Sequence, residues 1–161
     1  MDEEKDFQRA KELAINYISY RPRSSNEVKS HLIHKGYTLP LAYRVVDYLT
    51  QAHYLDDPEF AQRWYLSRLQ KGGYGPFLIR NELMAKGIPP EICQDLRDRF
   101  YPEEREREEV MRLLEKRIMH SLRDPREKGR HYRMLIRRGF SSAIAMDVLG
   151  MKSSDNTHGE R

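Results

Sequence analysis

The sequence predicts an all-α protein, an elongated tandem array of three three-helix repeats that resemble helix-turn-helix units. Apolar residues recur at helical spacing along most of the chain, and a first stripe contains Ala10, Leu13, Ala14, Tyr17 and Ile18. No stretch combines sustained alternation with many β-branched residues, so no strand is expected. A helix–glycine–helix pattern occurs three times, and such internal repetition is typical of modular helical arrays.

The first repeat is predicted to span residues 1–57. Its first helix covers residues 7–20. "SSNE" then predicts a capping box, with Ser24 as the N-cap and Glu27 three residues later. The second helix ends at Gly36, and a third helix begins near Pro40.

The second repeat is predicted to span residues 58–101 and follows the stretch "YLDDPEFAQRW". Asp57 is expected to be the N-cap of a helix over residues 59–70, with Pro58 at its first position. Asp56 has two open roles, because it can reinforce this cap or form an ion pair with Arg68. A catalytic or metal site is not expected, because no further ligand or partner lies at suitable spacing. "GGYGP" then precedes the middle helix as a flexible elbow.

The third repeat is predicted to span residues 102–150. Its first helix covers residues 103–121, and Asp124-Pro125 begins the next one in the same way as Asp57-Pro58. Residues 151–161 carry no core pattern, and a disordered tail is expected there.

The three glycines that define the repeats are Gly36, Gly87 and Gly139, which are 51 and 52 positions apart. Each has a leucine four residues before it, a basic residue directly before it and an apolar residue directly after it. Glycine readily adopts the left-handed conformation that ends a helix, and the next apolar residue then packs on the last helical turn. The pattern therefore predicts a glycine-terminated helix and a short turn in every repeat.

Composition and charge limit the possible functions. The chain has 161 residues, of which 39% are apolar and 34% charged, and its net charge is +4. The single cysteine, Cys93, cannot form an internal disulfide and is expected in the core, which fits a reducing compartment. No apolar run approaches the length of a membrane span, so we expect a soluble, cytoplasmic protein without membrane contact. We also expect it to be a monomer.

Basic residues concentrate in residues 112–138, which hold ten basic and three acidic residues, a net charge of +7. They are Arg112, Lys116, Arg117, Arg123, Arg126, Lys128, Arg130, Arg133, Arg137 and Arg138. Arg126, Arg130, Arg133 and Arg137 share one helix face by their spacing. This face is either merely solvated or a surface for phosphates or an acidic protein, and the preference for arginine favours binding.

No motif for catalysis or cofactor binding is visible. His31 and His34 lie three residues apart, but no further ligand makes zinc binding plausible. The chain has no Ser/His/Asp order, no phosphate-binding loop and no dinucleotide-binding loop. We therefore expect no enzyme activity, no cofactor and no metal.

The chain resembles the RecX regulatory proteins of bacteria over roughly residues 10–150. The motif that carries this resemblance consists of Leu55, Asp56, Asp57, Phe60, Ala61 and Trp64. It continues with Arg68 and "GGYGPFLIRNELMAKGI", and "RPRSSNEVKSHLIHKG" resembles the family's first unit. His53 is a departure, because the family usually has glycine there.

The resemblance implies a negative regulator of the RecA recombinase without catalytic activity or a cofactor. Such proteins lie in the groove of the RecA filament on single-stranded DNA and restrain ATP hydrolysis, strand exchange and filament growth. Single-stranded DNA is then reached through the filament.

We expect the partner surface to be a concave or edge face built from basic residues. Its candidates are Arg63, Arg68, Lys71, Arg80, Lys86, Arg126, Lys128, Arg130, Arg133, Arg137 and Arg138. The alternative is a helix-turn-helix regulator that binds a specific duplex sequence in the major groove. Binding to one defined duplex would favour the alternative, and preference for RecA-coated single strands would favour the first hypothesis.

Overall fold

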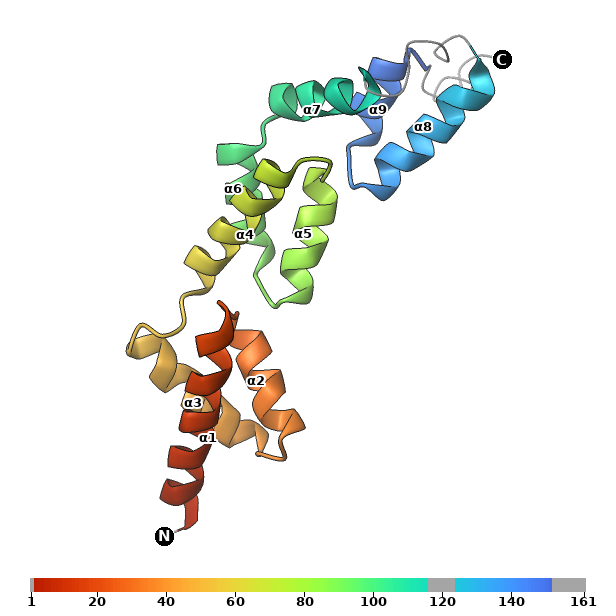
Figure 1. Cartoon of the computed structure of the whole chain (residues 1–161). Helices are drawn as coiled ribbons and strands as arrows, with labels where there is room; N and C mark the ends of the chain where they lie inside the picture. The colour runs from red at the N-terminus through yellow and green to blue at the C-terminus, as the bar shows by residue number, and fades with distance from the viewer. Residues whose placement is uncertain (1, 116–123, 152–161) are drawn as a thin grey trace, which may run out of the picture. The chain divides into compact units, whose positions relative to one another are not determined.

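The computed structural model describes residues 2–115 and 124–151, and these residues form nine α-helices and no strand (Figure 1). The helices are α1 (Asp2–Tyr20), α2 (Ser25–His34), α3 (Leu39–Gln51), α4 (Asp57–Lys71), α5 (Pro76–Ala85), α6 (Pro90–Phe100), α7 (Glu103–Glu115), α8 (Pro125–Arg137) and α9 (Ser142–Leu149). The all-α prediction is confirmed. The predicted continuation of α7 over residues 116–121 and the predicted disorder of residues 152–161 lie outside the described residues.

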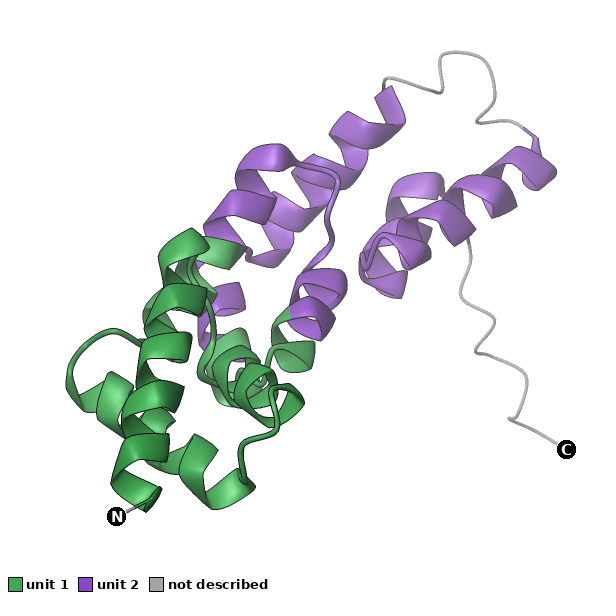
Figure 2. Ribbon diagram, turned by 60° about the horizontal axis from the view of Figure 1, so that its bottom comes forward, with its two compact units in different colours: residues 1–64, 83–93 green, residues 65–82, 94–161 purple. Residues whose placement is uncertain are grey.

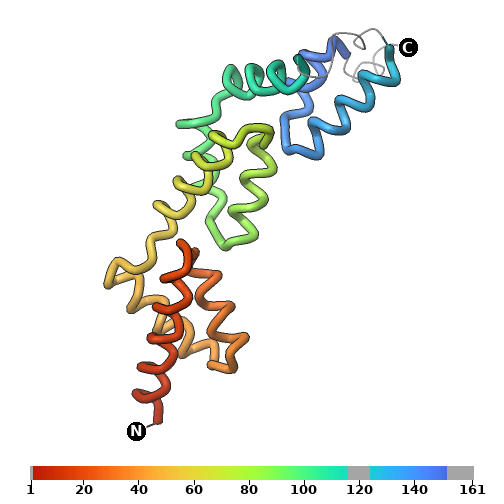
Figure 3. Tube along the Cα trace, in the orientation of Figure 1, coloured from red at the N-terminus to blue at the C-terminus, as the bar shows by residue number. Residues whose placement is uncertain are grey.

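A glycine-terminated helix is found at all three predicted positions, and Figure 3 follows the chain through the three turns. Gly36, Gly87 and Gly139 have φ values of 96°, 79° and 85°, in the left-handed region. In each turn the residue after the glycine donates its backbone N–H to the carbonyl of the leucine four residues before the glycine, at 3.0–3.1 Å. This is the bond pattern of a Schellman motif, and it explains the recurrent leucine–glycine spacing.

The chain folds into two compact units (Figure 2). Unit 1 comprises residues 1–64 and 83–93, and unit 2 comprises residues 65–82 and 94–161. The division falls inside α4, α5 and α6, so the second helix triplet contributes to both units. The boundaries of the three sequence repeats remain a prediction.

The core of unit 1 lies between α1, α2 and α3. Its fully buried residues include Ala10 and Ala14 of α1, Leu32 of α2 and Leu49 of α3. The two alanines allow α1 to approach the larger side chains closely, and burying one leucine contributes about 2 kcal/mol. Leu55, from the motif after α3, completes this cluster.

The core of unit 2 combines aromatic and aliphatic side chains. Tyr65 and Tyr101 meet edge to face with their ring centroids 6.4 Å apart, and Leu135 and Val110 are fully buried. Among the described residues, no helix is both long and apolar enough to span a bilayer.

Candidate interaction surfaces

The two aspartates of "YLDDPEFAQRW" cap two different helices. Asp56 accepts a hydrogen bond from the backbone N–H of Glu59 at 3.0 Å, so Asp56 caps α4. The prediction that Asp57 is this N-cap was therefore wrong, because α4 begins one residue earlier than expected. The Asp57 carboxylate instead accepts the backbone N–H of Ser25 at 2.8 Å, in the first turn of α2. Both carboxylates thus stabilise helix ends.

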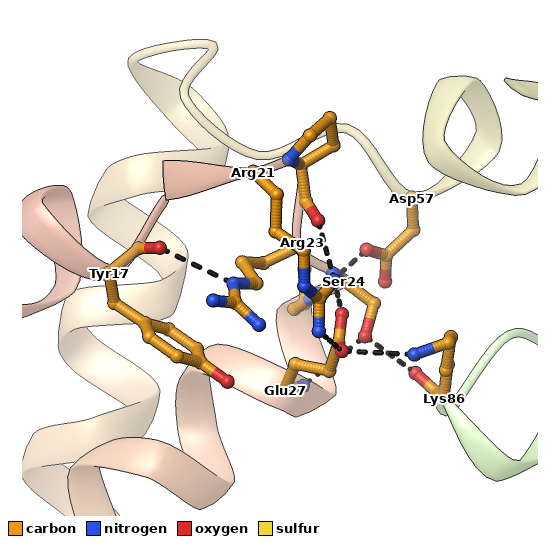
Figure 4. A network of polar contacts seen from close by, with 9 residues as sticks. Tyr17, Arg21, Arg23, Ser24, Glu27, Asp57 and Lys86 are labelled. Atoms are coloured by element: carbon orange, nitrogen blue, oxygen red, sulfur yellow. Dashed lines mark hydrogen bonds and ion pairs between the residues drawn. The ribbon is translucent and has the colours of Figure 1, made fainter. Parts of the chain in front are cut away.

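The first turn of α2 is the centre of a polar network in unit 1 (Figure 4). The predicted capping box is present: Ser24 Oγ accepts the Glu27 N–H at 3.2 Å, and Glu27 Oε2 accepts the Ser24 N–H at 2.9 Å. Glu27 Oε1 also accepts hydrogen bonds from Arg21 at 2.8 Å and from Lys86 at 3.0 Å. Burial by itself would raise the pKa of Glu27, but these bonds from Arg21, Ser24 and Lys86 lower it to about 2.

Lys86 joins this network through its main chain as well as its side chain. Ser24 Oγ donates to the Lys86 carbonyl at 2.8 Å, and the Lys86 ammonium lies 4.6 Å from the centre of the Trp64 ring. Phe60 stacks beside Trp64, so the two aromatic residues of the motif form one wall around this lysine. Lys86 therefore stabilises unit 1 itself, and a partner contact by Lys86 remains a prediction.

Unit 2 contains a corresponding junction between the α8–α9 turn and the first turn of α5. The backbone N–H of Gly75 donates to the Arg138 carbonyl at 2.7 Å, and that of Phe77 donates to the Gly139 carbonyl at 2.9 Å. The backbones are so close that a Cβ on Gly75 would lie 2.1 Å from the carbonyl carbon of Gly139. The Arg138 guanidinium bends towards the Gly73 carbonyl at 3.4 Å, and so it contacts its own chain.

A buried carboxylate that the sequence did not reveal connects three helices of unit 2. Glu106 of α7 is fully buried and accepts hydrogen bonds from the backbone N–H and the hydroxyl of Ser141, at 2.5 and 2.9 Å. Ser141 is the N-cap of α9, so Glu106 supplies the cap from another helix. Arg97 of α6 lies 3.5 Å from the same carboxylate. Nothing in the stretch "YPEEREREE" distinguishes Glu106 from the neighbouring glutamates.

The predicted arginine stripe lies on an exposed face of α8. Arg126, Arg130, Arg133 and Arg137 are all exposed, whereas the buried residues of the same helix are His131, Met134 and Leu135. Arg130 pairs with Glu127 at 3.3 Å but keeps 73% of its side chain exposed. Lys128 is partly buried. Lys116, Arg117 and Arg123 lie outside the described residues, and Arg112 is held by Glu109 through bonds of 2.9 and 2.5 Å.

Arg68 and Lys71 of α4 surround Tyr74 in unit 2. The Arg68 guanidinium lies 4.7 Å from the ring centre of Tyr74, and the Lys71 ammonium lies 5.8 Å from it. Arg68 donates to Glu82 at 2.8 Å, so its observed carboxylate partner is Glu82, and the Asp56 carboxylate serves the α4 cap instead.

A small cavity of about 190 Å³ adjoins this cluster. Its lining residues are Arg68, Leu69, Gly72, Tyr74, Tyr101, Arg105, Glu108, Glu109 and Arg112. Arg112, together with the Gly73 N–H, lowers the pKa of Glu109, and burial raises the pKa of Tyr101. The carboxylates offset the arginine charge, so this cavity is a poor site for an anion.

The remaining basic residues that were predicted for the partner surface do not lie on the face of α8 that carries the arginine stripe. Arg63 is exposed on α4 and pairs with Glu59 at 2.6 Å, and Arg80 is exposed on α5. Arg63 and Lys86 belong to unit 1, and the other candidate basic residues belong to unit 2. Within unit 2, the arginine stripe is the set that one helix face brings together.

Unit 1 also contains a groove that the sequence analysis did not predict. A groove of about 440 Å³ has the exposed rings of Tyr20 and Tyr54 and the side chains of Arg21 and Arg63 along its lining. Its wall includes His53, whose φ of 62° lies in the left-handed region that favours glycine.

The two histidines of α2 and the cysteine were the remaining candidates for metal or redox chemistry, and all three lie within residues 2–115 and 124–151. No group of three or more His, Cys, Asp or Glu side chains there could hold a metal ion. Cys93 is buried, as predicted. His31 stacks on Tyr17 with ring centroids 3.9 Å apart, and the Arg23 guanidinium lies 3.8 Å from the centre of the Tyr17 ring.

Comparison with known proteins identifies the family. The family model "RecX, first three-helix domain" matches residues 10–49, and "RecX, second three-helix domain" matches residues 56–96. The regulatory protein RecX of Mycobacterium sp. (strain JLS) is 33% identical over 142 residues, which cover 84% of this chain and 76% of the relative. The crystal structure of RecX from Lactobacillus salivarius shares the fold, with a TM-score of 0.79 at 23% identity over 90% of this chain and 94% of that one.

Some relatives are considerably longer. RecX of Bacillus subtilis (strain 168) is 31% identical over 153 residues, or 91% of this chain, but the match covers 57% of the relative. The corresponding share for Oceanobacillus iheyensis RecX is 59%. The two matched domains and the similarity to relatives of both lengths agree: the chain belongs to the RecX family of regulatory proteins.

Proposed function

We propose that this chain is a negative regulator of the RecA recombinase. It binds in the groove of the filament that RecA forms on single-stranded DNA, and it restrains ATP hydrolysis, strand exchange and filament growth. Membership of a family of regulatory proteins, rather than of enzymes, is the observation that carries this proposal. The chain acts as a cytoplasmic monomer, and it reaches single-stranded DNA through the filament.

The arginine stripe of α8 is the surface that best suits an anionic filament. Four exposed guanidinium groups follow one face of a single helix, and Glu127 is the carboxylate paired with one of them in the described residues. Planar guanidinium groups bind phosphates and carboxylates through two parallel hydrogen bonds. Since the stripe is not needed for the core, it is available to DNA phosphates or to acidic side chains of RecA.

The test is the single-stranded-DNA-dependent ATPase activity of RecA, measured while this protein is titrated in. Wild-type protein should inhibit, and Arg130→Glu/Arg133→Glu should need about tenfold more protein for the same inhibition. Inhibition should weaken between about 50 and 200 mM salt, because ionic contacts release counterions on binding.

The matched control is Lys5→Glu/Arg9→Glu, which makes the same change in net charge at two exposed positions of α1. This variant should inhibit within about twofold of wild type. If wild-type protein leaves RecA turnover unchanged, the proposed function is wrong. If both double variants inhibit equally well, the stripe is not the contact surface.

No observation on the described residues favours the duplex-binding alternative.

A further inference from the structure

Two of the three glycine turns are packed against the first turn of another helix in the same chain. The turn at Lys86–Gly87 meets the N-terminus of α2 in unit 1, and the turn at Arg138–Gly139 meets the N-terminus of α5 in unit 2. The two junctions have the same plan. The carbonyl of the basic residue accepts a hydrogen bond from the N-cap residue of the other helix, and the glycine lets the two segments touch.

In unit 1 two polar contacts, which Figure 4 shows, and one close approach form this junction. The Lys86 carbonyl accepts the Ser24 hydroxyl at 2.8 Å, and the Lys86 ammonium pairs with Glu27, the third residue of α2, at 3.0 Å. A Cβ on Gly87 would lie 2.5 Å from the Cβ of Asn26. The turn therefore recognises a helix that begins with a small donor and carries a carboxylate three residues later.

In unit 2 the donor is a backbone group. The Gly75 N–H donates to the Arg138 carbonyl at 2.7 Å, and a Cβ on Gly139 would lie 2.2 Å from the backbone nitrogen of Leu78. In both junctions a donor at the start of a helix satisfies the carbonyl of the basic residue in the turn: a side-chain hydroxyl in unit 1 and a backbone N–H in unit 2.

The remaining turn, Lys35–Gly36, has the same internal structure, but it borders a hollow of about 520 Å³ whose lining includes Gly36, Tyr37 and the side chains of Glu3 and Asp6 of α1. Gly36 has φ 96°, and Tyr37 donates its N–H to the Leu32 carbonyl at 3.1 Å, as in the other two turns. A Cβ on Gly36 would meet nothing within 4 Å. The Lys35 side chain is exposed, and the described part of the chain places no carboxylate within ion-pair distance of it.

We propose that the Lys35–Gly36 turn docks on the first turn of a helix in the partner protein. That helix carries a serine, threonine or glycine at its N-cap and an aspartate or glutamate three residues later. The carboxylate pairs with Lys35 as Glu27 pairs with Lys86, and the N-cap donates to the Lys35 carbonyl as Ser24 donates to that of Lys86. This inference rests on the proposed function, which makes RecA the partner.

A second copy of this chain is a poorer occupant. The exposed N-terminus of α8 begins at Asp124, whose carboxylate already accepts the Arg126 N–H at 2.9 Å. A carboxylate cap offers no donor, and its oxygen would repel the carbonyl oxygen of Lys35. The cap of α4, Asp56, has the same shortcoming.

The experiment is co-sedimentation of the full chain with RecA filaments assembled on single-stranded DNA with a non-hydrolysable ATP analogue. Lys35→Glu opposes the partner carboxylate. Gly36→Asn adds a side chain to the docking face, while asparagine still tolerates the left-handed conformation. Each variant should bind about tenfold more weakly than wild type, with an unchanged melting curve, and Lys5→Glu should bind within about twofold.

Each other outcome overturns a stated part of the proposal. If wild type sediments with the filament and both variants do so equally well, the docking turn is wrong and the proposed function stands. If Lys35→Glu binds the filament weakly but Gly36→Asn binds as well as wild type, direct docking of the turn is also wrong. The charge of Lys35 would then act at long range, without contact between the turn and a helix. If the wild-type protein does not sediment with the filament, the proposed function is wrong, and RecA is not the partner of this turn. Self-association that Gly36→Asn abolishes would make a second copy the occupant.

Discussion

At the scale of single residues, Glu27 shows how a charged group is held in unit 1. Its carboxylate accepts hydrogen bonds from Arg21, Ser24 and Lys86, which offset the cost of burial and lower its pKa from 4.5 to about 2. A carboxyl group with a lowered folded-state pKa stabilises the fold above its unfolded-state pKa. That contribution is lost as the pH falls from about 4.5 to about 2.

Glu27→Gln should therefore lower the free energy of unfolding by about 2 kcal/mol at neutral pH, because three donors lose a charged acceptor. The difference from wild type should shrink as the pH falls through this window, since glutamine does not titrate. Urea unfolding at a series of pH values measures both effects.

The control for Glu27 is Glu59→Gln, which also removes a carboxylate paired with an arginine. Glu59 and Arg63 are mostly exposed, so their ion pair should be worth less than about 1 kcal/mol. Equal losses for the two variants would show that the network in unit 1 adds nothing beyond a surface ion pair.

Single residues also show where sequence reasoning ends. The Ser24 capping box was predictable because its two residues lie three positions apart and bond to each other. Asp57 and Glu106 were not, because their bonds reach Ser25 and Ser141, which are distant in sequence. A cap supplied by another helix leaves no local pattern, so Asp57 was predicted to be the cap of its own helix, and Glu106 could not be distinguished from the other glutamates of α7.

At the scale of elements, glycine is required at different positions for two different structural reasons. Gly36 has the positive φ that the sequence pattern predicted, and a Cβ there would meet nothing within 4 Å. Gly75 has no positive φ, and its lack of a side chain matters because another backbone approaches it. This approach joins α5 to the α8–α9 turn, a contact between segments more than sixty residues apart that no local spacing reveals.

Gly75→Ala and Gly129→Ala should consequently have opposite effects. A Cβ at Gly75 would lie 2.1 Å from backbone atoms, so the junction must open and unfolding should become easier by about 3 kcal/mol. Gly129 lies within α8, and its added Cβ would meet only the tip of Arg133 at 3.4 Å. Alanine there should stabilise the protein by about 0.5–1 kcal/mol. Thermal unfolding of both variants distinguishes the two glycines, and destabilisation of similar size would contradict this assignment.

At the scale of the whole molecule, the repeated sequence predicted three successive helix triplets, and the described residues confirm that the chain is helical. Packing then divides the chain elsewhere, since the middle triplet contributes to both compact units. A helix whose apolar residues contact two neighbouring helices belongs to both packing units. The spacing of apolar residues predicts which face of a helix is buried, but it does not predict which helix covers that face.

The end-to-end arrangement predicted for the three repeats can be tested by small-angle scattering on the intact chain. A compact globule of 161 residues has a radius of gyration of about 15 Å, and a row of three repeats should give a clearly larger value. The composition is consistent with the larger value, because a charged share of 34% is high and suits an elongated helical protein with a large surface per residue. A dilution series excludes association as the cause of a large radius. A concentration-independent radius near that of a globule would contradict the array, and a filament-binding surface would then have to lie on one compact face.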